Sequence, residues 1–109
     1  MDTTGLVFSA GPEGSCDDFR VGGATVDHDA VTGEWRMWYY CRNRGFDGPP
    51  MFGTGRIALA RSDDGVHWQR VQGEEALGSM FAPSSAPDDF DSLHIGLTDI
   101  TRDAGCWLM

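Results

Sequence analysis

The order of apolar and polar residues predicts four short strands in the first two thirds of the chain. They cover residues 22–30, 34–41, 56–62 and 66–71. Each segment alternates between two faces or is rich in residues that favour a pleated surface, and turn residues separate the segments. No stretch keeps an apolar period of 3.6 residues over three turns, so we expect no substantial helix. The pattern predicts an all-β fold with one antiparallel sheet in meander order.

Alternation within residues 34–41 places the aromatic side chains on two faces of a strand. One face carries Trp35, Met37 and Tyr39, and the other carries Arg36, Trp38 and Tyr40. These side chains could form a platform for stacking sugars or a core between packed layers. Because both faces are apolar, the pattern favours the core.

A second copy of the pattern begins near residue 88. Residues 17–19, 23–25 and 33–37 recur in the same order at 88–90, 96–98 and 105–109. A four-stranded unit that recurs in tandem is typical of a β-propeller, with one blade in each repeat.

The second copy stops inside its second strand, which predicts a single incomplete propeller domain over residues 1–109. Its parts are a lead-in (1–18), a first blade (19–71), an inter-blade loop (72–92) and the start of a second blade (93–109). Because one and a half blades cannot close a ring, we expect the aromatic side chains of residues 35–40 to be left exposed and the fragment to self-associate through open blade faces.

The charge balance excludes several classes of partner. The chain has 17 acidic and 8 basic residues, a net charge of −9 and no lysine. It would be repelled by nucleic acid and by anionic lipid, and it contains neither a membrane-spanning run nor a secretory signal. Cys16, Cys41 and Cys106 form no CxxC pair, so we expect no zinc site and no disulfide framework but reduced thiols in a cytoplasmic protein.

Three motifs carry a resemblance to a known family. They are GEWRMWYY at 33–40, RIALARSDDGVHW at 56–68 and FDSLH at 90–94. Together they resemble the five-bladed β-propeller glycoside hydrolases, a group that includes arabinanases, xylosidases, invertases and levansucrases. The resemblance covers residues 17–109. It implies a parent that hydrolyses glycosidic bonds of a furanosyl or pentosyl saccharide with carboxylates on the propeller axis, the general acid being a Glu of a later blade.

The resemblance also implies which residues line the pocket. Asp18 and Asp91 would each supply a catalytic carboxylate, and Arg20, Asp89 and His94 would contact the saccharide. From the residues alone, Asp18 could equally be an acidic turn, and Asp91 a turn residue that bonds its own backbone. Gly22-Gly23 stands where the family has Asp-Pro, which favours the alternative of a non-catalytic propeller that binds a saccharide or a protein. A purely structural product without activity is the third hypothesis.

Two further segments, 62–68 and 42–55, each allow a structural and a functional interpretation. In the turn 62–68, an Asp side chain is expected to bond the turn amides, Gly65 to adopt a positive φ and Trp68 to pack behind, which is a structural role on the outer rim. The 42–55 loop could set specificity for sugar hydroxyls or a carboxylated sugar, or it could be a plain linker. Its candidate contacts are Arg42, Arg44, Phe46, Asp47, Phe52 and Arg56.

No cofactor is expected. A structural Ca²⁺ held by Asp27, Asp29 and Asp99 is considered, since carboxylates are its usual ligands, but it is not favoured.

Overall fold

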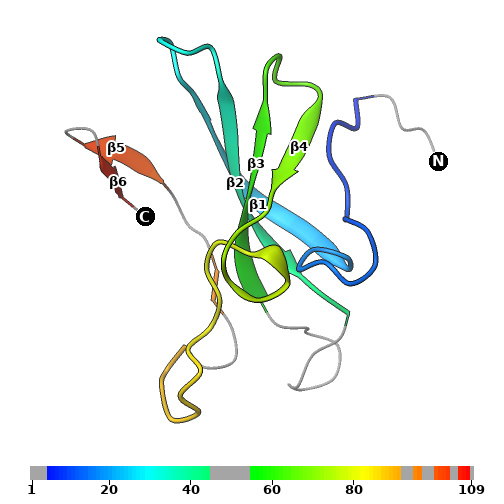
Figure 1. Ribbon diagram of the computed structural model, residues 1–109, viewed down its shortest axis with the longest axis vertical. Coiled ribbons are helices and arrows are strands. Elements are labelled where there is room, and N and C mark those ends of the chain that lie inside the picture. Colours follow the sequence, from blue (N-terminus) through cyan, green and yellow to red (C-terminus); the bar gives the residue numbers. More distant parts are fainter. Residues whose placement is uncertain (1–4, 45–54, 92–94, 97–99, 104–105, 109) are drawn as a thin grey trace.

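The computed structural model describes residues 5–44, 55–91, 95–96, 100–103 and 106–108, and their main feature is a four-stranded antiparallel sheet (Figure 1). The strands run in the order β1-β2-β3-β4. Their bounds are β1 (Arg20–His28), β2 (Trp35–Arg42), β3 (Gly55–Ser62) and β4 (Trp68–Val71). A separate two-stranded sheet pairs β5 (Thr101–Asp103) with β6 (Cys106–Leu108). The expected all-β meander is confirmed.

Helical structure within the described residues is limited to one 3₁₀ turn, Ala76–Gly78. None of the described elements is a helix of the length and apolarity that crossing a membrane requires. Residues 92–94 and 97–99, which belong to the second copy of the pattern, lie outside the described residues, as do 104–105 and 109. The β5–β6 hairpin nevertheless lies in the segment assigned to that second copy.

The first strand starts earlier than expected and contains an irregularity. Its pairing with β2 shifts between Gly22 and Thr25, and Gly23 has a φ of 54°. A positive φ is inexpensive for glycine because it lacks a Cβ. Gly23 and Ala24 therefore stand opposite the single residue Tyr39, which is the arrangement of a β-bulge and bends the strand.

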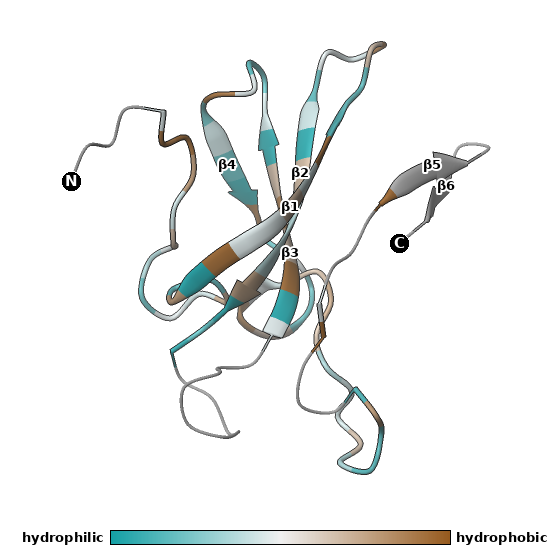
Figure 2. Cartoon of the chain, turned by 180° about the vertical axis from the view of Figure 1, so that it is seen from behind, coloured by the Kyte–Doolittle hydropathy of each residue, from teal (hydrophilic) through white to brown (hydrophobic). Residues whose placement is uncertain are grey.

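The sheet carries a core on each face, as the alternation in β2 predicts. Hydrophobic and hydrophilic residues follow one another in short bands along the strands (Figure 2). Met37 and Tyr39 belong to one core, and Trp38 belongs to the other. The first core also contains Cys16, Cys41, Ala58 and Ala60, and the second also contains Ile57, Leu59 and Ile100. The inter-layer role of these aromatic residues is thus confirmed over the sugar-stacking platform.

Segments of the same chain cover both faces, so the expectation of bare blade faces is wrong. Phe8 and Cys16, from the segment before β1, pack on the first core. Met80, Ile95 and Ile100, from the segment after β4, pack on the second. As a result Met37 and Trp38 are only 7% and 8% exposed. The segments before β1 and after β4 fold back because the apolar surface that they bury would otherwise face water.

The segment after β4 returns to the sheet instead of leaving it. Phe81 forms an isolated antiparallel bridge with Ile57, near the start of β3. The amide of Ile57 donates to the carbonyl of Phe81 at 3.0 Å, and the amides of Met80 and Phe81 donate to the carbonyl of Ile57 at 2.8 and 3.1 Å. Since β4 pairs only as far along β3 as Leu59, this bridge occupies the part of the β3 edge that β4 leaves open.

Candidate functional site

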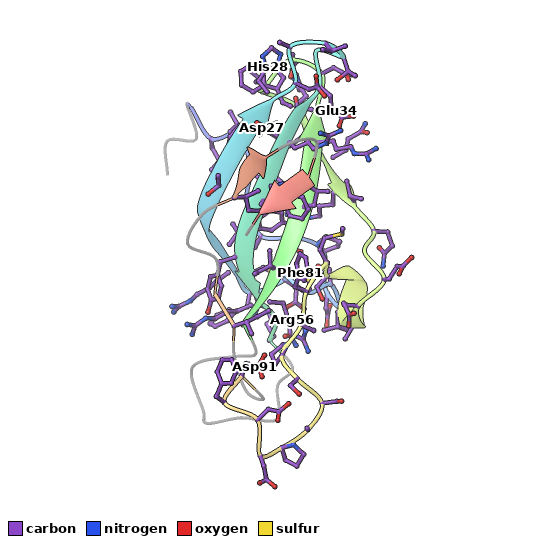
Figure 3. The ribbon with its side chains drawn as sticks, turned by 90° about the vertical axis from the view of Figure 1, so that its left-hand side faces the viewer. Asp27, His28, Glu34, Arg56, Phe81 and Asp91 are labelled. Carbon is purple, nitrogen blue, oxygen red and sulfur yellow. The ribbon has the colours of Figure 1, made fainter. Side chains whose placement is uncertain are left out.

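The two ends of the four-stranded sheet differ in chemistry. Figure 3 shows His28 and Glu34 at one end and Arg56 and Asp91 at the other. The first end, formed by the β1–β2 and β3–β4 turns, is called the turn end here. The second, where β1 begins and β2 ends, is called the arginine end, because it carries Arg20, Arg42, Arg44 and Arg56.

Strand register places Arg20 and Arg42 on one face of this end of the sheet and Arg56 on the other. Arg20 is the antiparallel partner of Arg42. Arg56 pairs with Cys41, the residue before Arg42. Arg44 follows two residues after β2 and donates through its backbone amide to Asp18 at 2.7 Å. Half of the arginines of a chain with net charge −9 therefore lie at one end of one sheet.

Asp18 holds the backbone at this end. One carboxylate oxygen, Oδ2, accepts the amide of Gly14 at 2.9 Å, and the other, Oδ1, accepts the amide of Arg44. Its own carbonyl accepts Nε of Arg44 at 3.3 Å. The hydrogen bond from Gly14 is the main reason that the pKa of Asp18 lies below its usual range, and the Arg44 amide and guanidinium add to it. The buried carboxylate thus stays ionised and joins the lead-in to the end of β2.

Phe19 and two arginines form the most exposed part of the arginine end. The guanidinium carbon of Arg20 lies 4.9 Å from the centre of the Phe19 ring, and that of Arg44 lies 5.9 Å from it. Within the described ranges neither guanidinium makes an ion pair with a carboxylate. The ring attracts both guanidinium groups, and both arginines are exposed to solvent.

Arg56 lies on the face that carries Cys16 and Cys41. Its Nη1 donates to Oδ1 of Asn43 at 2.5 Å. Its Nε is buried and has no hydrogen-bond partner among the residues that the structure describes. An unsatisfied buried donor is uncommon in folded proteins.

Asp17, the residue before Asp18, is the centre of a buried network. Its side chain is 1% exposed, and its Oδ2 accepts the Tyr39 hydroxyl at 2.9 Å and Nε of Arg70 at 2.7 Å. Its Oδ1 accepts the hydroxyl of Ser15 at 2.8 Å. Burial, with the Asp17 charge second, raises the pKa of Tyr39 far above its usual value, so the phenol stays protonated and donates. The predicted burial of Tyr39 could have pointed to an acceptor such as Asp17, because a buried phenol needs a hydrogen-bond partner.

The remaining predicted residues are less closely joined. Asp89 accepts the Ser84 hydroxyl through Oδ2 at 2.5 Å, and the carbonyl of Asp91 accepts the Ser84 amide at 3.1 Å. The half-buried Asp91 lies at the arginine end, beyond Arg56 (Figure 3). Among the described contacts, none links Asp91 to Asp18. His94 lies outside the described residues, as do Phe46, Asp47, Phe52 and Asp99.

The turn at 62–68 has the expected structure. Oδ1 of Asp64 accepts the amides of Val66 and His67, both at 2.8 Å, and Oδ2 lies 2.7 Å from Nδ1 of His67. These bonds, with His67 as the largest contributor, lower the pKa of Asp64. Gly65 has a φ of 77°, and Nε1 of Trp68 donates to its carbonyl at 3.1 Å.

A cleft of about 490 Å³ lies beside this turn. Its lining is Glu34, Arg61, Ser62, Asp63, Asp64, His67, Trp68 and Gln69.

Over the part of the chain that the structure describes, no three His, Cys, Asp or Glu side chains gather as metal ligands. Asp29, one of the candidate calcium ligands, instead accepts the amides of Val31 and Thr32 in the β1–β2 turn, at 2.9 and 3.3 Å.

Comparisons with protein-family models, with curated proteins and with solved structures found no match to this chain.

Proposed function

We propose that the chain belongs to a five-bladed β-propeller of the glycoside-hydrolase type and that its arginine end binds a saccharide that carries a carboxylate. The observation that carries the proposal is the gathering of Arg20, Arg42, Arg44 and Arg56 at the end of the sheet where β1 begins. The four-stranded meander, the turn at 62–68 and the internal repeat support the propeller.

The chemistry of this end suits a carboxylated sugar better than a neutral one. A guanidinium can bind a carboxylate through two parallel hydrogen bonds. Arg20 and Arg44 flank Phe19, and an aromatic ring can also contact the apolar face of a sugar. Because the whole chain carries a charge of −9, attraction of an anion must come from this local cluster. Binding should therefore weaken as salt is added.

Hydrolysis by the parent propeller is the second candidate, and Asp91 is the observation that favours it. Glycosidases use two carboxyl groups, one as acid and one as base or nucleophile. Asp18 has both oxygens bonded to backbone amides and a lowered pKa, which suits a positioning role. Asp91 is half-buried at the same end, beyond Arg56 (Figure 3), and it remains the candidate for a pocket carboxylate.

Binding is tested by titrating the full chain with galacturonic acid oligomers and with neutral galactose oligomers of equal length, using calorimetry. We expect the acidic oligomer to bind and the neutral one to bind more weakly. Arg44→Gln should raise the Kd for the acidic oligomer by on the order of tenfold, since hydrogen bonds to charged groups contribute about 1.5–3 kcal/mol. Arg61→Gln, at the turn end, is the matched control. Equal losses in both variants, or equal binding of both oligomers, would refute the proposal.

Hydrolysis is tested with a panel of nitrophenyl furanosides and pyranosides. We expect the 109-residue chain alone to release no nitrophenol, because it offers no identified second carboxyl group for the reaction. Turnover that survives purification and disappears in Asp91→Asn but not in Asp63→Asn would establish hydrolysis by this chain, and turnover lost in Asp18→Asn would return Asp18 to a catalytic role.

A further inference from the structure

Two of the three cysteines lie side by side in the core, although 25 residues separate them in the chain. Cys16 precedes β1 in the lead-in, and Cys41 is near the end of β2. The Cys41 thiol donates to the Cys16 sulfur across 3.5 Å. Cys16 is 4% exposed and Cys41 is fully buried. Their spacing in the sequence gave no indication of a pair.

The surroundings of the two sulfurs are polar on one side only. Asp17 and its network adjoin Cys16, and the Cys41 sulfur also lies 3.6 Å from the carbonyl oxygen of Arg56. The hydrogen bond from Cys41 lowers the pKa of Cys16, and the guanidinium charge of Arg56 acts in the same direction. The Cys41 thiol, which donates that bond and is buried, has a raised pKa. The two thiols are therefore unequal, with Cys16 the one that ionises first.

We propose that Cys16 and Cys41 form a redox-active dithiol that closes to a disulfide by exchange with a small oxidised disulfide such as glutathione disulfide. In the first step the Cys16 thiolate attacks one sulfur of the small disulfide, whose S–S bond breaks and releases one small thiolate. In the second step Cys41 loses its proton, attacks the Cys16 sulfur and displaces the second small thiolate. The two protons end on the two small thiols, so two protein thiols are oxidised and one small disulfide is reduced.

The bond would fix the lead-in onto the sheet. Cys16 lies in the segment that covers the first core, and only its packing and its hydrogen bonds hold that segment against β2 in the reduced chain. A covalent link at this point shortens the loop that can open and confines the neighbouring Asp17 and Asp18 to the arginine end. Closure thereby stabilises both the core and the backbone geometry of that end.

Burial sets the condition for the reaction. Because both sulfurs are covered, the lead-in must open transiently before a small disulfide can reach Cys16. The equilibrium constant for forming the disulfide therefore describes the Cys16–Cys41 pair more directly than the rate of its formation does. Preorganisation of the sulfurs should favour closure at equilibrium in the folded chain over the unfolded chain, in which the same two residues meet only at random.

The experiment uses Cys106→Ser, which retains only the proposed pair, and the unaltered chain beside it. Each is equilibrated with defined ratios of reduced and oxidised glutathione, alkylated and digested with trypsin. Because every basic residue is an arginine at a known position, Cys16 falls in peptide 1–20 and Cys41 in peptide 37–42. We expect these peptides to be recovered linked, with the loss of two hydrogens, and to separate after reduction.

The same equilibrium is measured in urea that unfolds the chain. We expect the closure constant against glutathione to be larger in the folded chain by on the order of tenfold or more. The oxidised chain should also melt at a higher temperature than the reduced chain, and this difference should vanish in Cys41→Ala. Recovery of both peptides as separate glutathione adducts or free thiols, linkage between chains only, or equal closure constants in folded and unfolded chains would each overturn the proposal. The measurement on Cys106→Ser stands even if Cys41→Ala does not fold.

Discussion

The two ends of the sheet satisfy their polar groups in opposite ways. At the turn end, Asp29 and Asp64 bond amides two and three residues further along the chain. At the arginine end, Asp18 bonds Arg44, 26 residues away, and the preceding residue, Asp17, bonds Tyr39 and Arg70 beneath the first core, 22 and 53 residues away. The first end forms as soon as its hairpins form, whereas the second requires the whole sheet and the lead-in to be in place.

The two kinds of carboxylate should contribute unequally to the stability of the fold. Water can replace the hydrogen-bond partners of a carboxylate in an exposed local turn, so these hydrogen bonds contribute little net stability. A buried carboxylate with distant partners loses more when a partner is removed, because the group left behind stays desolvated. Loss of the buried carboxylates Asp17 and Asp18 should therefore lower the free energy of unfolding more than loss of the exposed carboxylates of the turn end.

Removal of the Asp17 carboxylate should have the largest effect. Asp17→Ala leaves the buried Tyr39 hydroxyl without its acceptor and Arg70 without its ion-pair partner. We expect a loss of about 3 kcal/mol in the free energy of unfolding, measured by urea denaturation. Asp63→Ala, at an exposed position of the turn end, is the control. Equal losses in the two variants would show that the buried network contributes no more than a surface carboxylate.

Truncation of Trp68 should come next. The indole packs on the first core and donates to the carbonyl of Gly65, but the side chain is only half-buried. We therefore expect Trp68→Ala to cost about 2 kcal/mol, below the 3–5 kcal/mol typical of a fully buried tryptophan. Thermal and urea unfolding measure the loss. A variant with unaltered stability but weaker saccharide binding would instead assign Trp68 to a ligand site.

Asp18 should have an intermediate effect on stability. Asp18→Ala removes the acceptor of two backbone amides, those of Gly14 and Arg44, and we expect a loss of about 1–2 kcal/mol. Asp18→Asn keeps one acceptor oxygen and should lose less. The same pair of variants bears on function, since a positioning role predicts that Asp18→Asn retains most of the affinity for the acidic oligomer in calorimetry. A complete loss of binding in a folded Asp18→Asn would assign the carboxylate to direct contact.

The smallest effect is expected at Asp64, where the informative variable is pH. The hydrogen bonds from His67 and Val66 lower the pKa of this carboxyl in the folded chain. Its contribution to stability is therefore present above the pKa of the unfolded chain, about 4, and is lost as pH falls through the lower folded value. The stability difference between the unaltered chain and Asp64→Ala should be constant near neutral pH and shrink below about pH 4. An Asp64 carboxyl that titrates by NMR at the value of an unfolded chain, about 4, would contradict this.

The sequence predicted the local features of this protein well. Strand alternation placed Met37 and Tyr39 on one face and Trp38 on the other, and both assignments are confirmed. The turn at 62–68 has its expected Asp, Gly and Trp roles. These features depend on side-chain direction along a strand and on hydrogen bonds within a few residues, both of which follow from the local sequence.

The contacts of the buried carboxylates and cysteines depend on segments that are far apart in the chain. From the sequence we chose Asp18 over the adjacent Asp17, whereas the partners that distinguish the two carboxylates lie on β2, β4 and the residues after β2. The pairing of Cys16 with Cys41 and the return of the chain to cover both faces depend in the same way on contacts between distant segments. Local pattern fixes which way a side chain points, but which remote group meets it depends on how the whole chain closes around the sheet.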